Sequence, residues 1–137
     1  EVWPLIEGGK SVAATNHASS GAWAAAGGIG TVSAVNADSY DDNGDMIPQV
    51  FFGKTRAERH EELVEYGIRG GIAQVKRAHD IAGSTGAVNI NVLWEMGGAQ
   101  RILHGILISL FVIRPGTDER SLSNSLRGMI AGMPISV

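Results

Sequence analysis

Pairs of adjacent glycines punctuate this chain, and they constrain its fold more than any other feature. The pairs are Gly8-Gly9, Gly27-Gly28, Gly70-Gly71 and Gly97-Gly98. Glycine allows sharp backbone turns and lets two elements approach closely. Because the pairs lie among apolar stretches, we expect many tight junctions between strands and helices rather than a flexible linker.

Three stretches predict β-strands. Trp3–Ile6 is a short apolar run that ends at a Gly-Gly turn, and we expect it to be buried. Ile29–Val35 is rich in β-branched residues, which favour strands. Gly86–Trp94 alternates between apolar residues and the polar Asn89 and Asn91, which therefore share one face of the strand.

Three further stretches predict helices. Ser19 and Ser20 are candidate caps for an alanine-rich helix. Thr55 and Glu58 have the spacing of a capping box and precede a long amphipathic stretch. A third helical pattern follows the last glycine pair and could change to a strand in the apolar run Leu107–Ile113.

The alternation of these strands and helices predicts an α/β fold built from parallel βα units. In such folds ligands bind at the carboxyl ends of the strands. Gly8, Gly9 and Lys10 follow the first strand, and the face that carries Asn89 and Asn91 leads to the end of the third. We therefore expect these five residues to converge on one rim.

Other site motifs are incomplete. Gly9-Lys10-Ser11 matches the end of a phosphate-binding loop, but Pro4 stands where the first glycine belongs, so a phosphate-binding α/β module is only an alternative. The acidic stretch Asp38–Asp45 lacks the glutamate that closes a calcium loop. His60-Glu61 lacks the second histidine of a zinc motif. We predict no metal site.

Composition limits the partners. The 137 residues suit a single domain, and a net charge of −3 without a basic cluster makes nucleic acid an unsuitable partner. The longest apolar run is shorter than the ~20 residues of a membrane helix. We expect no membrane partner and, since no signal peptide is visible, a cytoplasmic location.

Three segments in order resemble the nitronate monooxygenase family, also called 2-nitropropane dioxygenase. They read PLIEGGKSVAATNHASSGAWAAAGGIGTVSAVNA, then RHEELVEYGIRGGIAQVKRAHDIAG, then AVNINVLWEMGGAQ. The resemblance covers about residues 3–107, whereas residues 108–137 diverge from the family pattern. It implies the first part of an FMN-dependent (β/α)8 barrel, about half of a TIM-type barrel.

The resemblance also implies a function and a site. The function is oxidation of alkyl nitronates, the small-molecule substrates, by dioxygen through a flavin and a histidine base. Gly8, Gly9 and Lys10 match the family turn beside the flavin ring. Asn89 matches the asparagine that contacts the flavin, with Asn91 as the alternative.

The family's catalytic histidine and flavin phosphate loops lie in later strands that have no counterpart in this sequence. None of the four histidines matches the catalytic position, so the catalytic residue is unknown. We therefore expect a truncated form with weak or no activity. An alternative is a non-catalytic remnant that forms a homo-oligomer through its exposed sheet edge.

Overall fold

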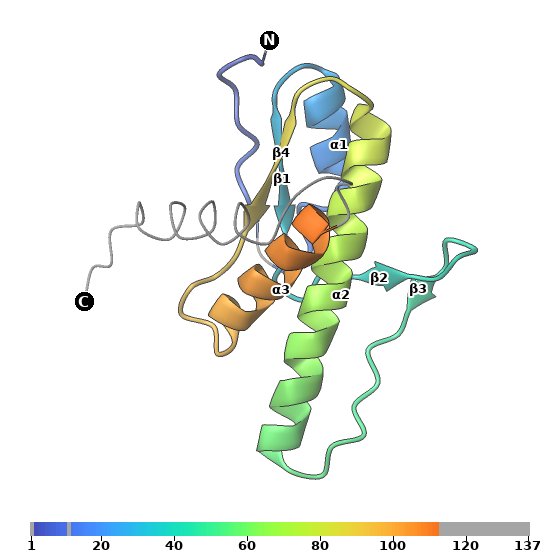
Figure 1. Ribbon diagram of the computed structural model, residues 1–137, viewed down its shortest axis with the longest axis vertical. Helices are drawn as coiled ribbons and strands as arrows, with labels where there is room; N and C mark the ends of the chain where they lie inside the picture. The colour runs from blue at the N-terminus through green and yellow to red at the C-terminus, as the bar shows by residue number, and fades with distance from the viewer. Residues whose placement is uncertain (1, 11, 113–137) are drawn as a thin grey trace. The chain divides into compact units, whose positions relative to one another are not determined.

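The computed structural model describes residues 2–10 and 12–112. Its elements, in chain order, are α1 (His17–Ala25), β1 (Ile29–Ser33), β2 (Ser39–Tyr40), β3 (Met46–Ile47), α2 (Arg56–Ala82), β4 (Ala87–Asn91) and α3 (Ala99–Val112). The chain up to Ile106 forms one compact unit, and a second unit begins at Leu107. The first unit contains every described strand and the helices α1 and α2 (Figure 1).

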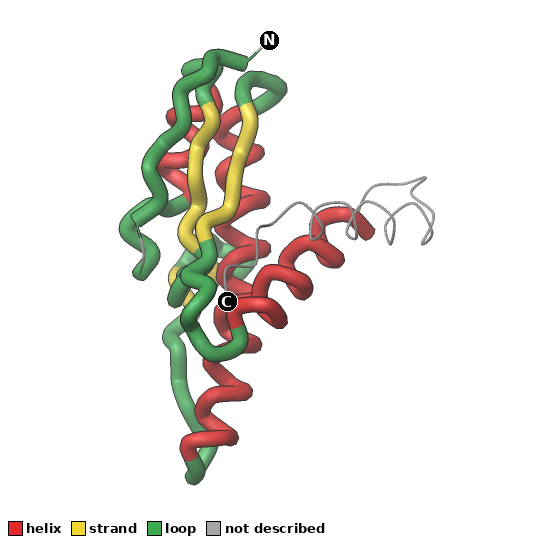
Figure 2. Tube along the Cα trace, turned by 90° about the vertical axis from the view of Figure 1, so that its left-hand side faces the viewer, coloured by secondary structure: helices red, strands yellow, loops and turns green. Residues whose placement is uncertain are grey.

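A small parallel sheet forms one layer of the first unit. β1 pairs in parallel with β4, from Ile29 opposite Ala87 to Ser33 opposite Asn91. A third extended segment, Trp3–Glu7, joins the other edge of β1 through a parallel bridge between Ile6 and Ile29. Figure 2 shows the three segments side by side, with α1 and α2 behind them. The prediction of an α/β fold with parallel strands is confirmed.

The prediction of a buried first strand is wrong. Trp3, Leu5 and Ile6 are 66%, 57% and 62% exposed. The segment does bond to β1, because Trp3 N–H donates to Gly27 O and Glu7 N–H donates to Ile29 O, both at 2.8 Å. It is exposed because it lies at the edge of the sheet, where none of the described elements covers its outer side.

Helix α1 starts earlier than its serines suggested. Asn16 is the N-cap, and its side chain accepts from the N–H groups of Ala18 and Ser19, while Ser19 returns a hydrogen bond to Asn16. Ser20 lies inside the helix, where its carbonyl packs against Gly30 of β1. A side chain at position 30 would collide with that carbonyl, so glycine allows the helix to approach the sheet closely.

Helix α2 confirms the capping box. Thr55 Oγ1 accepts from Glu58 N–H at 3.2 Å, and the Glu58 carboxylate accepts from Thr55 N–H at 2.9 Å. The helix continues for 27 residues without a break at its glycines. Gly67 and Gly71 instead receive Ile102 and Ile106 of α3, which are buried. The helix glycines therefore serve close packing.

The acidic stretch forms a hairpin rather than an irregular loop. β2 and β3 pair antiparallel around a turn in which Asp41 Oδ1 accepts from Asn43 N–H at 2.9 Å and Asp45 N–H at 2.8 Å. These bonds satisfy the turn backbone, which explains the polar composition. Within residues 2–10 and 12–112, no three acidic or histidine side chains gather as a metal site.

Helix α3 begins at the last glycine pair, as predicted, and remains helical through Val112. The predicted change to a strand within Leu107–Ile113 does not occur in its described part. The rest of the divergent tail, residues 113–137, lies outside the described residues. No helix among the described residues is long and apolar enough to cross a membrane.

Candidate functional site

The turn after the first extended segment meets the end of β4. A Cβ added at Gly9 would lie 2.7 Å from both Cβ and Nδ2 of Asn91, so the Gly9 backbone lies directly against that side chain. Asn91 is the last residue of β4. A turn and a strand end that are far apart in the sequence are therefore adjacent at the carboxyl ends of parallel strands. We call Gly8, Gly9, Lys10 and Asn91 the Gly9–Asn91 site.

The two asparagines of β4 differ in position. Asn91 is half-buried, and its backbone carbonyl accepts from Ala34 N–H at 2.9 Å, which ties β4 to the end of β1. Its side-chain amide has no hydrogen bond within the described residues. Asn89 is exposed, and its Oδ1 accepts from the N–H of Ile90 at 2.9 Å. The structure thus brings Asn91, and not Asn89, to the turn.

The turn itself is held by Thr15. Lys10 N–H donates to Thr15 Oγ1 at 3.2 Å, and the same hydroxyl donates to Lys10 O at 3.3 Å. Thr15 O in turn accepts from Ser33 N–H at 3.0 Å, so the turn is fastened to β1. Val12 and Ala13 have φ values of 58° and 56°. A β-branched residue in this left-handed region stores about 1–2 kcal/mol of strain.

Two further polar groups lie buried beside the turn. Glu7 is 8% exposed, and its Oε2 accepts from Thr31 N–H at 2.8 Å. The carboxylate thus takes the place of the backbone carbonyl that a neighbouring strand would offer, because the first segment leaves β1 at this point. Thr31 is 3% exposed, and its Oγ1 has no hydrogen-bond partner among the described residues. Since Gly30 faces α1, Thr31 faces away from the helices, as does its register partner Asn89.

A polar cluster near the start of α1 was not predicted. Gln74 is 1% exposed, and its Oε1 accepts from the backbone N–H of His17 at 2.7 Å. His17 Nδ1 lies 2.9 Å from the same oxygen. Gln74 Nε2 donates to Asp38 O at 3.0 Å, which fixes the orientation of the amide. Because Oε1 only accepts, Nδ1 carries the proton in neutral His17, and Nε2 keeps its lone pair.

Aromatic and cationic groups surround this cluster. The ring of His17 packs edge-on against Tyr40 at 5.3 Å, and the guanidinium of Arg77 lies 4.1 Å from the centre of the Tyr40 ring. These contacts join α1, α2 and the β2–β3 hairpin. Long-range pairs of this kind leave no local spacing pattern, which explains why sequence reasoning missed them.

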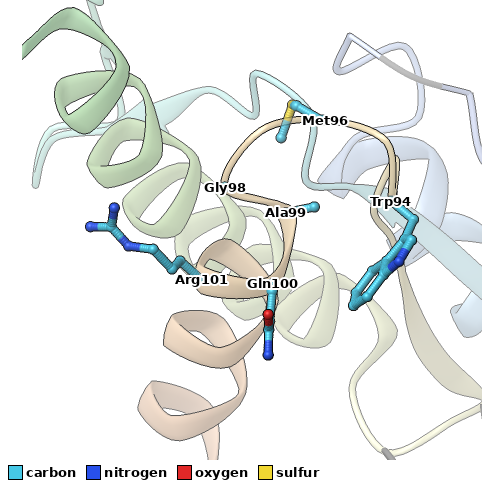
Figure 3. Close-up of a pocket in the computed structure, with 6 residues that line it drawn as sticks. All are labelled: Trp94, Met96, Gly98, Ala99, Gln100 and Arg101. Atoms are coloured by element: carbon cyan, nitrogen blue, oxygen red, sulfur yellow. The ribbon is translucent and has the colours of Figure 1, made fainter. Parts of the chain in front are cut away.

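A shallow hollow of about 360 Å³ lies after β4. It is lined by Trp94, Met96, Gly98, Ala99, Gln100 and Arg101. Figure 3 shows Trp94 and Gln100 pointing to the same side of the loop, whereas Arg101 projects away from it. Arg101 forms an exposed ion pair with Glu61 at 2.8 Å. The hollow therefore presents an indole and an amide rather than a free charge.

The turn gives little support to a phosphate-binding loop. Such loops lead directly into a helix whose N–H groups face the phosphates. Here residues 12–14 form a turn, and the first N–H groups of α1 are already capped by Asn16. Ser11 lies outside the described residues.

Comparison with known proteins identifies no relative: no family model, no curated protein and no solved structure matches this chain.

Proposed function

We propose that the Gly9–Asn91 site binds FMN and that the chain belongs to a flavin enzyme that oxidises alkyl nitronates with dioxygen. The observation that carries this proposal is the contact of the Gly9 backbone with the Asn91 side chain at the carboxyl ends of parallel strands. Ligands of α/β folds bind at this end. The resemblance to the nitronate monooxygenase family points to the same turn and the same strand.

Three features of the site suit a flat, polar cofactor. Gly9 is exposed, and its missing Cβ lets the Asn91 side chain lie against the backbone, where the unbonded amide supplies both a donor and an acceptor. Lys10 is exposed and forms no ion pair within the described residues. Its ammonium group is thus available to a carbonyl oxygen of the electron-poor flavin ring.

When bound, FMN would supply the redox chemistry, accepting electrons from the nitronate and passing them to dioxygen. The residues of this chain would orient the ring and contribute hydrogen bonds to it. In this proposal the three parallel segments are consecutive strands of a (β/α)8 barrel, and the Gly9–Asn91 site lies at the end of the barrel where catalysis occurs in that fold.

Flavin titration tests the proposal. FMN added to the purified chain is expected to show a quenched, protein-dependent fluorescence. Asn91→Ala should weaken binding about tenfold, as expected for the loss of one to two hydrogen bonds. Asn89→Ala is the matched control, since Asn89 lies off the contact. Oxygen uptake with ethyl nitronate measures turnover. FMN binding that is absent, or equally affected by both substitutions, would overturn the proposal.

The exposed edge favours a second candidate function, self-association with another copy of this chain. Glu7 N–H and Leu5 O bond to β1, so the N–H and carbonyl of Ile6 point outward by alternation. An edge with open backbone groups and large apolar side chains is a template for strand pairing. Light scattering should show a dimer that Ile6→Lys dissociates. Phe52→Lys, at an 81% exposed position elsewhere, should leave the dimer intact.

A further inference from the structure

A second hollow, of about 350 Å³, lies beside the first turns of α2. It is lined by Phe51, Arg56, Arg59, His60 and Leu63. The four α2 residues follow the spacing i, i+3, i+4 and i+7, so they share one face of the helix. None of them belongs to the Gly9–Asn91 site. The hollow thus combines two guanidinium groups and an imidazole with an apolar wall.

The carboxylates nearest in sequence form no ion pair with Arg56 or Arg59 within the described residues. Glu58 accepts from Lys54 N–H at 2.7 Å and from Thr55 N–H at 2.9 Å. Glu62 accepts from Phe52 N–H at 3.1 Å and Gly53 N–H at 2.9 Å. Both side chains are thus occupied by the loop backbone. Among the described residues, the only ion pair joins Arg101 to Glu61.

The apolar wall of the hollow is held in place. The Phe51 ring packs edge-on against Tyr66 at 5.7 Å. The Tyr66 hydroxyl donates to Val50 O at 2.7 Å and accepts from Val50 N–H at 3.1 Å. Arg59 Nε donates to Gly53 O at 2.8 Å, which leaves its two terminal nitrogens for another acceptor. Loop and helix therefore form one preorganised surface.

We infer that this hollow binds a small phosphate monoester whose apolar body lies against Phe51 and Leu63. Arginine side chains favour phosphate because their planar fork matches two of its oxygens, and two of them on one helix face reach a single anion. The hollow is open rather than enclosed, which suits a small ligand that keeps one side in solvent. This inference does not depend on FMN binding at the Gly9–Asn91 site.

Calorimetry with phenyl phosphate, inorganic phosphate and phenol tests the inference on the full chain. Phenyl phosphate is expected to bind best, inorganic phosphate more weakly, and phenol not measurably. Arg56→Gln should weaken phenyl phosphate about tenfold, the effect of losing one charge-assisted hydrogen bond. Lys76→Gln is the matched control, because it removes the same charge from an exposed position of α2 outside the hollow.

A second variant distinguishes the contribution of the aromatic ring to binding from that of the arginines. Phe51→Leu should weaken phenyl phosphate about threefold or more and leave inorganic phosphate unchanged, because it removes only the aromatic contact. Circular dichroism establishes that each variant keeps its helices. The inference would be overturned if phenyl phosphate did not bind or if phenol bound equally well. It would also be overturned if Arg56→Gln and Lys76→Gln weakened phenyl phosphate binding by the same factor. Asn91→Ala should not affect phenyl phosphate, so failure here is distinguishable from failure of the FMN proposal.

Discussion

The backbone of Gly9 lies directly against the side chain of Asn91, which joins the first turn of the chain to the end of β4. A methyl group at position 9 would stand 2.7 Å from Asn91 Cβ, well inside van der Waals contact. Gly9→Ala is therefore expected to lower the free energy of unfolding by about 1–3 kcal/mol, as overpacking does. Urea denaturation measures the change.

Gly8 provides the control, because a Cβ at position 8 would meet no atom within 4 Å. Gly8→Ala should change the stability by less than about 0.5 kcal/mol. In a double-mutant cycle, Asn91→Gly should recover part of the loss caused by Gly9→Ala, since it removes the atoms in conflict. Similar losses for Gly8→Ala and Gly9→Ala would show that the contact is not as described.

Gly70 of α2 supports a second prediction. Alanine normally stabilises a helix interior over glycine by about 1 kcal/mol. A Cβ at position 70, however, would collide with the carbonyl oxygen of Ala37. Gly70→Ala should thus destabilise the chain despite its better helix propensity, which thermal unfolding would reveal. Glu65→Ala, at an exposed position of α2, should be close to neutral, and a gain in stability for Gly70→Ala would contradict the packing.

The buried amide of Gln74 leads to a third prediction. Gln74→Leu would leave His17 N–H and Asp38 O without their partner, at a cost of about 1–3 kcal/mol for each buried group left unpaired. Gln100→Leu, on the exposed first turn of α3, serves as the control. In the unaltered chain, long-range ¹H–¹⁵N correlation at alkaline pH should show the proton of His17 on Nδ1. A proton on Nε2 would exclude the described hydrogen bond.

Glu58 gives the stability a pH dependence. The backbone N–H of Thr55, with smaller contributions from Lys54 N–H and the Thr55 hydroxyl, lowers the pKa of Glu58 below its ordinary value of 4.5. A carboxyl with a lowered folded-state pKa stabilises the fold above its unfolded pKa, and this contribution is lost as the pH falls through the folded pKa. Stability should therefore decrease on acidification below about pH 4.5.

The variant Glu58→Gln distinguishes the contribution of this carboxyl to the pH dependence from that of the other carboxyls. Glutamine keeps the acceptor of the capping box but does not titrate in this range. Urea midpoints measured across the acid range should thus fall less steeply for Glu58→Gln than for the unaltered chain. If the two proteins gave parallel pH profiles, the capping box would not stabilise the charged form of Glu58.

Much of the fold could be predicted from local signals. The Thr55 and Glu58 pair located the start of α2, and the alternating stretch located β4, because caps and periodicity depend only on neighbouring residues. That the turn at Gly9 would approach the end of β4 was expected from the parallel topology, whereas contact with Asn91 rather than Asn89 was not. Parallel strands place their carboxyl ends at one edge, so order along the chain was sufficient.

Other features depended on contacts between distant residues. Asn16, Ser19 and Ser20 are equally good capping residues, so the local sequence does not specify which of them begins α1. The packing of Ser20 on Gly30 places Ser20 inside the helix and leaves Asn16 as the N-cap. The exposure of Trp3 arises because its apolar run lies at the sheet edge, which composition does not indicate. The His17 and Gln74 pair joins two helices and has no local signature.

The parallel pairing of β1 with β4 also determines how this chain can reach its folded state. Ile29 and Ala87 cannot meet until the intervening chain, which includes the 27 residues of α2, has become compact. Closing so long a loop before any strand contact is gained is entropically expensive, and such nonlocal topologies fold slowly. We expect α2 to form first and to shorten the loop that must close, so that the docking of the two strands on this helix limits the folding rate.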